Sequence, residues 1–330
     1  MVKSTSRFAA CLFALALFPA LPGLRATVTG DSLAAGIRYF ENGALDSATT
    51  FFENRLRLQP EDAQAHYFLG RISFAKNDLD TAEKHLLHAI RLEPGDSRFH
   101  TWIGTVYGNK INSAGFFSKY GMAKKIKFHF SRAIELDADN LEAREGLILF
   151  LMRAPAIVGG SIDKAKEHAR VLKSKDLLRG SLSMARIYEK EKKWPQAEAE
   201  YSAAVKELPN DDKARLQFGY FYQRQKKYAQ AFAIFEDMLA DSLNSRAALY
   251  QIGKTGALSG QNLDRAIACF QQYLQLKPGE DDPSWADAHW RLGMIYEHRQ
   301  QYKKARQHYR SALALEPDHR QARAAIKKLK

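Results

Sequence analysis

Histidines are the side chains of this sequence that could most simply be drawn into a metal site. His85 and His88 lie three residues apart, so on a helix they share one face, and His66 and His100 lie on neighbouring helical segments. Imidazole is a common zinc ligand, but the spacing motifs of known zinc sites are absent here. We therefore expect surface or groove histidines and no metal site.

Catalytic motifs are also absent. The sequence contains no His-Glu-x-x-His, no Gly-x-Ser-x-Gly and no phosphate-binding loop. It contains no Cys-x-x-Cys, which excludes the usual redox, zinc-ribbon and covalent haem sites. We predict that the protein is not an enzyme, has no catalytic residues and needs no cofactor.

The elements that would position any binding side chains repeat along the chain. A Gly or Ala recurs about 34 residues apart, followed by an aromatic residue, a second Ala, an apolar residue and often Pro. Copies begin at Ala35-Gly36, Leu69-Gly70, Met184-Ala185, Phe218-Gly219, Ile252-Gly253 and Leu292-Gly293. Small residues allow two helices to cross closely, and Pro ends the second helix.

This pattern resembles the tetratricopeptide repeat (TPR) family. The resemblance implies an all-α, right-handed superhelical solenoid of helix-turn-helix hairpins, with about eight hairpins in residues 29–318. A basic and apolar segment at 319–330 has the composition of a capping helix. The third and fourth repeats, 97–140 and 141–177, are longer than the others: the Tyr107–Phe130 spacing is ten residues above the regular value, and the turn near 153–161 holds five extra.

The turn of the fourth repeat carries a narrower resemblance. It reads Ala154-Pro155-Ala156-Ile157-Val158-Gly159-Gly160-Ser161, similar to a turn in small exported bacterial TPR proteins. Ser161 is the expected N-cap of the following helix, with Asp163 in its first turn. The narrower resemblance implies a bacterial envelope location and names no reaction.

The groove of the solenoid is the first candidate binding surface. In the TPR arrangement the first helices line the concave face, so residues at three- and four-residue spacing point into it. Aromatic rings give contact area, and Arg binds carboxylates through two parallel hydrogen bonds. This combination favours a partner with apolar and acidic segments. The predicted groove residues are Tyr67, Arg71, Phe74, Arg186, Tyr220, Arg224, Tyr250, Lys254, Trp290 and His298, with Met294 between the last two.

The extended third repeat is the second candidate. Residues 108–132 contain lysines and aromatic residues and no Asp or Glu. Such a segment can lie on an anionic lipid or glycolipid surface, or it can pack as a long hairpin with a solvated basic face. The lysines expected at such a surface are Lys110, Lys119, Lys124, Lys125 and Lys127.

The N-terminal segment differs from the rest of the chain. Lys3 and Arg7 precede a largely apolar stretch that is broken by Pro19 and Pro22, which is the layout of a cleavable signal peptide of residues 1–26. An uncleaved membrane anchor is the alternative. Cleavage would lower the net charge from +13 to +10, since 47 basic and 37 acidic residues would remain. It would also leave Cys269 as one cysteine on an apolar helix face, which we expect to be a packed thiol.

Two hypotheses follow. The first is a periplasmic or secreted adaptor that binds a partner peptide or helix in the concave groove. The alternative is a peripheral envelope protein that docks on anionic lipid or glycolipid through residues 108–132. Export argues against nucleic acid as a partner, and the sequence does not fix the oligomeric state.

Overall fold

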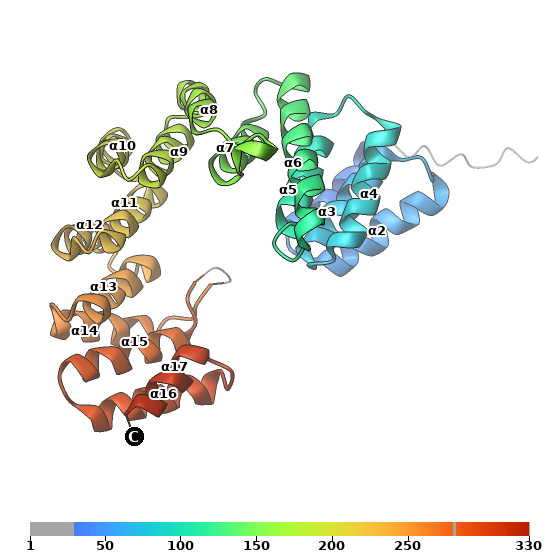
Figure 1. The fold of residues 1–330 in the computed structure, drawn as a ribbon. Coiled ribbons are helices and arrows are strands. Elements are labelled where there is room, and N and C mark those ends of the chain that lie inside the picture. The colour runs from blue at the N-terminus through green and yellow to red at the C-terminus, as the bar shows by residue number, and fades with distance from the viewer. Residues whose placement is uncertain (1–29, 280–281, 330) are drawn as a thin grey trace, which may run out of the picture.

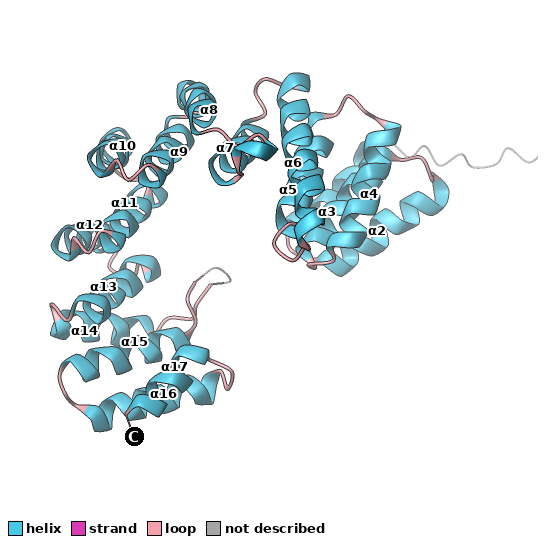
Figure 2. Cartoon of the chain, in the orientation of Figure 1, coloured by secondary structure: helices cyan, strands magenta, loops and turns pink. Residues whose placement is uncertain are grey.

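The computed structural model describes residues 30–279 and 282–329. Within them all regular secondary structure is helical, and loops join the helices, which confirms the predicted all-α solenoid (Figure 1; Figure 2). The first helices of the hairpins are α1 Gly30–Glu41, α3 Ala63–Ala75, α5 Ser97–Lys110, α7 Leu141–Arg153, α9 Leu177–Lys190, α11 Asp212–Arg224, α13 Arg246–Ser259 and α15 Trp285–His298. The second helices are α2 Leu45–Leu58, α4 Leu79–Leu92, α6 Phe116–Leu136, α8 Ile162–Lys175, α10 Trp194–Glu207, α12 Tyr228–Asp241, α14 Leu263–Tyr273 and α16 Tyr302–Leu315. The helix α17, Arg320–Lys328, follows, and a short 3-10 helix η1, Ala156–Val158, lies between α7 and α8.

Polar caps start most of the first helices. The carboxylates of Asp62, Asp96 and Asp211 each accept a hydrogen bond from a backbone N–H of the first turn. An N-cap of this kind satisfies an N–H that has no partner inside the helix and contributes on the order of 1 kcal/mol. Ser161 caps α8 in the same way, as the sequence predicted.

Small residues set the distance between the two helices of each hairpin. A Cβ added at Gly70 would lie 2.6 Å from Leu86, and one added at Gly219 would lie 2.3 Å from the ring of Phe235. Ala82 and Ala231, from the second helices of the same hairpins, are fully buried. The recurrent small residues are therefore needed because the helices touch there.

The core is a series of clusters along the solenoid. One cluster runs from the first hairpin to α9, a second from α9 to α15, and a third joins α15, α16 and α17. Ala322 of α17 is fully buried against α16, so α17 covers the apolar face of the last hairpin. Each hairpin thus depends mainly on its neighbours, as in other repeat proteins.

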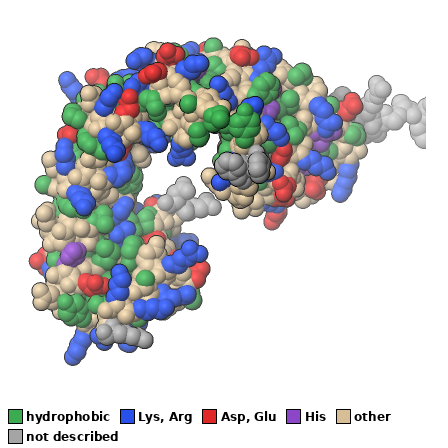
Figure 3. All heavy atoms as spheres, viewed as in Figure 1, with side chains coloured by type: hydrophobic (Ala, Val, Ile, Leu, Met, Phe, Trp, Pro, Cys, Tyr) green, Lys and Arg blue, Asp and Glu red, His purple; other side chains and the backbone are tan. Residues whose placement is uncertain are grey.

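The hairpins form an open arch (Figure 1). In the left-hand arm the first helices α9 and α11 lie on the inner side, and the second helices α10 and α12 lie on the outer side (Figure 1). Side chains of the first helices therefore face the hollow that the space-filling view shows (Figure 3).

The extra residues of the two long repeats occupy different elements. In the third repeat they lengthen the second helix, because α6 spans 21 residues where α4 spans 14. In the fourth repeat they form the turn that contains η1, where Gly159 has a φ of 90° and ends the 3-10 helix. The side chain of Lys127 from α6 packs over Gly159, so the two extensions touch.

Two further expectations concern single elements. Cys269 is buried with 1 % exposure on α14, which confirms a packed thiol, and burial raises its pKa to about 11.

Residues 1–26, the expected signal peptide, lie outside the described residues. Among the helices that are described, none has the length and apolar character needed to span a membrane.

Candidate ligand-binding groove

Arg71 of α3 lies among aromatic rings of neighbouring first helices. Its guanidinium carbon lies 4.5 Å from the ring centre of Phe40 on α1 and 4.7 Å from that of Trp102 on α5. Its Nε is buried without a hydrogen-bond partner among the described residues. Cation–π contacts therefore hold this guanidinium between three consecutive first helices, and no carboxylate of residues 30–279 or 282–329 forms an ion pair with it.

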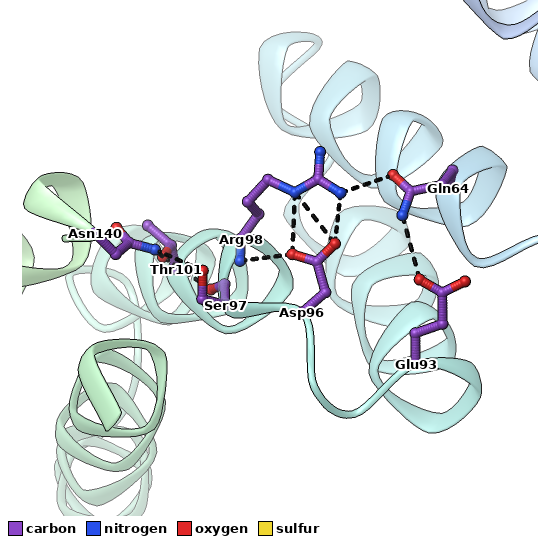
Figure 4. A network of polar contacts seen from close by, with 7 residues as sticks. All are labelled: Gln64, Glu93, Asp96, Ser97, Arg98, Thr101 and Asn140. Atoms are coloured by element: carbon purple, nitrogen blue, oxygen red, sulfur yellow. Dashed lines mark hydrogen bonds and ion pairs between the residues drawn. The ribbon is translucent and has the colours of Figure 1, made fainter. Parts of the chain in front are cut away.

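A polar network beside Arg71 joins α3, α5 and α7. Arg98 pairs with Asp96 and donates a 3.1 Å hydrogen bond to Gln64 (Figure 4). Asn140, the N-cap of α7, donates hydrogen bonds to Ser97 at 3.2 Å and Thr101 at 2.9 Å (Figure 4). These groups satisfy one another, so we assign this network a structural role.

Several basic side chains on the first helices of the C-terminal arm have no ion pair, and three of them are Arg186 on α9, Lys254 on α13 and Arg291 on α15. Arg186 is exposed, whereas Lys254 and Arg291 are half-buried. No ion pair joins any of the three to a carboxylate in residues 30–279 and 282–329. Basic side chains whose positive charge is not paired with a carboxylate can attract an anion.

Lys254 is a half-buried cation of α13. Burial and the nearby charges of Arg291 and Arg224 lower the pKa of its ammonium. Its Nζ lies 5.5 Å from the ring centre of Tyr220. Arg224 itself is paired with both carboxylate oxygens of Glu189, at 3.1 and 2.7 Å.

A second group of charges faces Glu145 of α7. Burial raises the pKa of this carboxyl, while Arg179, Lys213 and Arg186 act in the opposite direction. Arg179 approaches it at 3.9 Å. Cations from α9 and α11 therefore act on Glu145 of α7, together with Asp176.

Aromatic residues lie between these cations. Tyr220 is half-buried and accepts a hydrogen bond from Gln251 at 3.4 Å. Tyr250 is 5 % exposed and packs against Phe270 and Tyr273. Arg291 covers the ring of Trp290, with its guanidinium carbon 4.0 Å from the ring centre.

The predicted groove residues divide by exposure. Tyr67 is 3 % exposed and packs against Phe99 on the next first helix, so its ring serves mainly the contact between repeats. Phe74 is half-buried against Trp102. His298 reaches the carbonyl of Ala257 at 3.0 Å, beside Gly260. Arg186, Arg224, Lys254 and Trp290 remain partly accessible.

The lysines of the third repeat have different surroundings. Lys110 forms ion pairs with Asp80 and Glu83 of α4, so it is a link between neighbouring repeats. Lys125 lies over Tyr107 at 4.7 Å and within 3.9 Å of Glu83. Two of the five lysines are thus engaged with α4 or α5.

The other three lysines, Lys119, Lys124 and Lys127, form no ion pair among the described residues. Lys119 is exposed, and Lys124 is exposed with its Nζ 4.4 Å from the ring centre of Tyr120. Lys127 is half-buried against Gly159. Phe128, beside Lys127 in sequence, is 59 % exposed. In Figure 3 hydrophobic side chains gather over α6 and η1 near the middle of the arch.

Sequence reasoning missed Arg291 and the rings that hold Arg71. Arg291 follows Trp290 directly, and the four-residue spacing selected Trp290, Met294 and His298 instead. Phe40 and Trp102 belong to other repeats, and only the packing of consecutive first helices brings them to Arg71.

Sequence reasoning also missed how the histidines pair. The Nδ1 atoms of His66 and His85 lie 2.9 Å apart, and those of His100 and His129 lie 3.0 Å apart. Each pair joins the two helices of one hairpin. The described residues contain no cluster of three or more side chains suited to a metal ion.

Comparisons with known proteins agree with this fold. Tetratricopeptide-repeat family models match residues 39–102 and 286–319. A solved tetratricopeptide repeat protein from Parabacteroides merdae is 15% identical, with a TM-score of 0.55, over 80% of this chain and 97% of that one. The human IFIT1 dimer solved with m7Gppp-AAAA is 16% identical, with a TM-score of 0.53, over 89% of this chain and 70% of that one. The search of curated proteins gave no match.

These likenesses show the fold, and the matching models describe a repeat that generally serves as a non-catalytic scaffold for protein–protein interaction. The two matched segments lie at opposite ends of the solenoid, with helical hairpins of the same kind between them. Residues 39–102 and 286–319 are tetratricopeptide repeats, and the chain as a whole is an all-helical solenoid of the TPR kind.

Proposed function

We propose that this protein is a non-catalytic adaptor of the bacterial cell envelope. Its concave groove binds a peptide or helix of a protein partner, and acidic side chains of that segment contact the basic groove floor. The N-terminal segment, with its basic start and apolar run, supports export to the envelope. The TPR solenoid supports a binding role.

One observation carries the choice of partner chemistry. The inner face of α9, α13 and α15 presents Arg186, Lys254 and Arg291 without carboxylate partners among the described residues. Some basic side chains elsewhere pair across repeats, as Lys173 does with Glu200 and Arg265 with Glu236. Basic side chains without such a partner on the inner helices fit an acidic ligand.

Affinity capture from the native envelope tests this proposal. Arg186→Glu combined with Lys213→Glu reverses two exposed charges on the inner face, and we expect recovery of the partner to fall at least about ten-fold. Lys206→Glu combined with Lys226→Glu reverses two exposed charges away from the inner helices, on the outer helix α10 and in the turn before α12, and is the matched control. Both chains should keep the helical circular dichroism and melting temperature of the unchanged protein. Equal recovery with inner and outer substitutions would count against groove binding.

The exposed part of α6 supports a second candidate function, docking on an anionic membrane or glycolipid surface. Lys119 and Lys124 are exposed and have no acidic partner among the described residues, and Tyr120 and Phe128 are also accessible. Cations beside aromatic rings suit the headgroup region of a bilayer.

Vesicle sedimentation tests the second candidate. The protein should sediment with anionic vesicles and not with neutral ones, and Lys119→Glu with Lys124→Glu should remove the difference. Lys192→Glu with Lys193→Glu on the far arm controls for net charge. If the same fraction of protein sedimented with anionic and with neutral vesicles, docking on an anionic surface would be excluded.

A further inference from the structure

The turn between α7 and α8 presents an aliphatic side chain to solvent. Ile157, in the middle of η1, is 81 % exposed, whereas Val158 beside it packs against the core cluster of the N-terminal hairpins. The backbone N–H of Gly159 donates a 2.8 Å hydrogen bond to the carbonyl of Ala156, and Ser161 caps α8, so both ends of the turn are held. The turn therefore keeps Ile157 in solvent.

One face of α6 lies beside this turn. Tyr120, Lys124 and Phe128 follow one another at four-residue spacing, so they share a helix face, and all three are exposed. The Nζ of Lys124 lies 4.4 Å from the ring centre of Tyr120. A Cβ added at Gly159 would lie 2.5 Å from the Nζ of Lys127, so Lys127 connects α6 with the turn. We refer to Tyr120, Lys124, Lys127, Phe128 and Ile157 as the α6–η1 surface.

Basic residues outnumber acidic ones in the two segments that form this surface. Residues 116–136 and 153–161 contain six basic residues and one acidic residue, which gives a net charge of +5. The six are Lys119, Lys124, Lys125, Lys127, Arg132 and Arg153. Two acidic residues border the segments, since Glu83 approaches Lys125 at 3.9 Å and Asp163 follows in α8. With both included the net charge is still +3, so the surface is complementary to an anionic one.

The chain leaves the apolar part of this surface uncovered. The ring of Phe128 meets the ring of His129 edge-on, with 5.0 Å between the ring centres, and is nevertheless 59 % exposed. The hydrophobic side chains over α6 and η1 are visible together on the face of the arch turned to the viewer (Figure 3). Exposed apolar groups beside cations suit the boundary between lipid headgroups and acyl chains.

A phospholipid leaflet matches both parts of the surface. Its phosphates can contact Lys124 and Lys127, whose long side chains reach the charged layer while neighbouring apolar groups lie deeper. Ile157 and Phe128 extend only a short way beyond the backbone, so the acyl layer must lie directly below the phosphates. A large sugar headgroup would hold both side chains away from that layer. The short reach therefore favours anionic phospholipid over glycolipid.

We propose that the α6–η1 surface inserts into the boundary layer of an anionic phospholipid leaflet. Ile157 and Phe128 enter the acyl boundary, and Lys124 and Lys127 contact phosphates. This inference rests on the second candidate function, docking through α6, and adds the η1 turn and apolar insertion to it. A purely electrostatic contact would use the lysines and leave Ile157 in water.

Vesicle binding by the full chain tests the insertion. The vesicles contain equal parts of phosphatidylglycerol and phosphatidylcholine, and sedimentation gives the partition coefficient of the protein. Ile157→Gln and Phe128→Gln should each lower that coefficient about ten-fold, because each removes an apolar side chain from the acyl boundary. Ile157→Leu keeps the apolar area and should stay within about two-fold. Unchanged partition of both Gln variants would reject the insertion.

An exposed aliphatic residue elsewhere provides the matched control. Leu243, in the turn after α12, is 73 % exposed, and Leu243→Gln should leave the partition coefficient unchanged. Because Ile157 and Leu243 are both exposed, neither substitution removes core packing, and thermal melts check that each variant folds. If Leu243→Gln weakened binding as much as Ile157→Gln, general hydrophobicity would explain the effect and a defined surface would be contradicted.

A fluorescent residue reports the depth of insertion. A residue whose emission depends on its environment replaces Ile157 in one chain and Leu243 in another. Emission from position 157 should shift to the blue with phosphatidylglycerol vesicles, whereas emission from position 243 should not. A larger shift with vesicles that carry an anionic glycolipid at equal surface charge would overturn the choice of lipid. A shift with a lipid-free envelope extract but not with vesicles would overturn the proposal and assign the surface to a protein.

These results are distinguishable from failure of the second candidate function. If Lys119→Glu with Lys124→Glu abolishes binding to anionic vesicles but Ile157→Gln and Phe128→Gln bind normally, electrostatic docking stands and the insertion is wrong. If neither set of variants has an effect, α6 does not dock on the membrane.

Discussion

Paired histidines recur at one position of the hairpin in three repeats. His66 faces His85, His100 faces His129 and His289 faces His308, with Nδ1–Nδ1 distances of 2.9–3.0 Å. One ring of each pair must donate and the other accept, which requires at least one neutral ring. Cations lie nearby, among them Lys84, Lys125 and Lys304.

The pairs predict loss of stability in acid. Burial, assisted by the neighbouring charges, lowers the pKa of His85, His129 and His308 to about 4 from the ordinary 6.5. The unfolded chain therefore binds more protons below pH 6.5, and the free energy of unfolding falls as the pH drops from about 6.5 towards 4. Melting temperatures measured between pH 7 and 5, above the range in which most carboxyls titrate, should decline.

Substitution assigns that decline to the pairs. His85→Gln, His129→Gln and His308→Gln together should flatten the dependence of melting temperature on pH between 7 and 5, since Gln donates and accepts hydrogen bonds without titrating. An unchanged slope in the triple variant would assign the acid sensitivity to other groups.

The residue types of the groove were readable from the sequence, and their exact surroundings were not. Arg186 and Lys254 were predicted because three- and four-residue spacing places them on the face of the first helices that is expected to line the groove. Arg291 was missed because the residue spacing selected its neighbour Trp290, and the aromatic cage of Arg71 was missed because its rings come from different repeats. Contacts between repeats depend on how helices cross, which residue spacing does not specify.

At the scale of elements, close approach between helices makes a prediction about glycine. Gly219 of α11 lies where an added Cβ would be 2.3 Å from the ring of Phe235 on α12. Gly219→Ala should destabilise the chain by about 1–3 kcal/mol, because the fully buried ring must shift in a packed core. Urea unfolding followed by circular dichroism measures this change.

A second helical glycine provides the control. Gly121 lies inside α6, and an added Cβ would meet no atom within 4 Å. Gly121→Ala should stabilise the chain by roughly 0.5–1 kcal/mol, because Ala loses less backbone entropy in a helix. If both substitutions changed stability in the same direction, the assignment of Gly219 to a helix crossing would be wrong.

The extended repeats show where sequence reasoning stops at the element scale. The spacing from Tyr107 to Phe130 located the extra residues of the third repeat, but it did not decide between a longer loop and a longer helix. In the structure they lengthen α6, which remains anchored by the buried Ala123, Ile126 and Phe130. That outcome depends on the apolar face that α5 and α7 offer, which comes from other parts of the chain.

At the scale of the whole molecule, contacts between neighbours predict that damage stays local. Removing α17 would expose the apolar face formed by Ala305, Tyr309 and Ala312. Hydrogen exchange should then accelerate in α15 and α16 far more than in α9 to α12, because a solenoid transmits stability mainly to adjacent repeats. Acceleration of equal size along all hairpins would indicate one cooperative unit instead.

The recurring small and aromatic positions made the solenoid itself predictable, because one hairpin pattern repeated several times specifies the architecture. The ligand was not predictable to the same degree. A groove built from repeats can hold many partners, so the fold does not specify which of them binds.

The most direct test of the central claim is photo-cross-linking in the native envelope. A photoreactive residue replaces Lys213, which is exposed on the inner helix α11, and in a second chain it replaces Lys206 on the outer helix α10. Our account predicts that the Lys213 position cross-links to a specific protein through an acidic segment, whereas the Lys206 position does not. Cross-linking to that protein from Lys206 alone, or equally from both positions, would contradict binding in the concave groove.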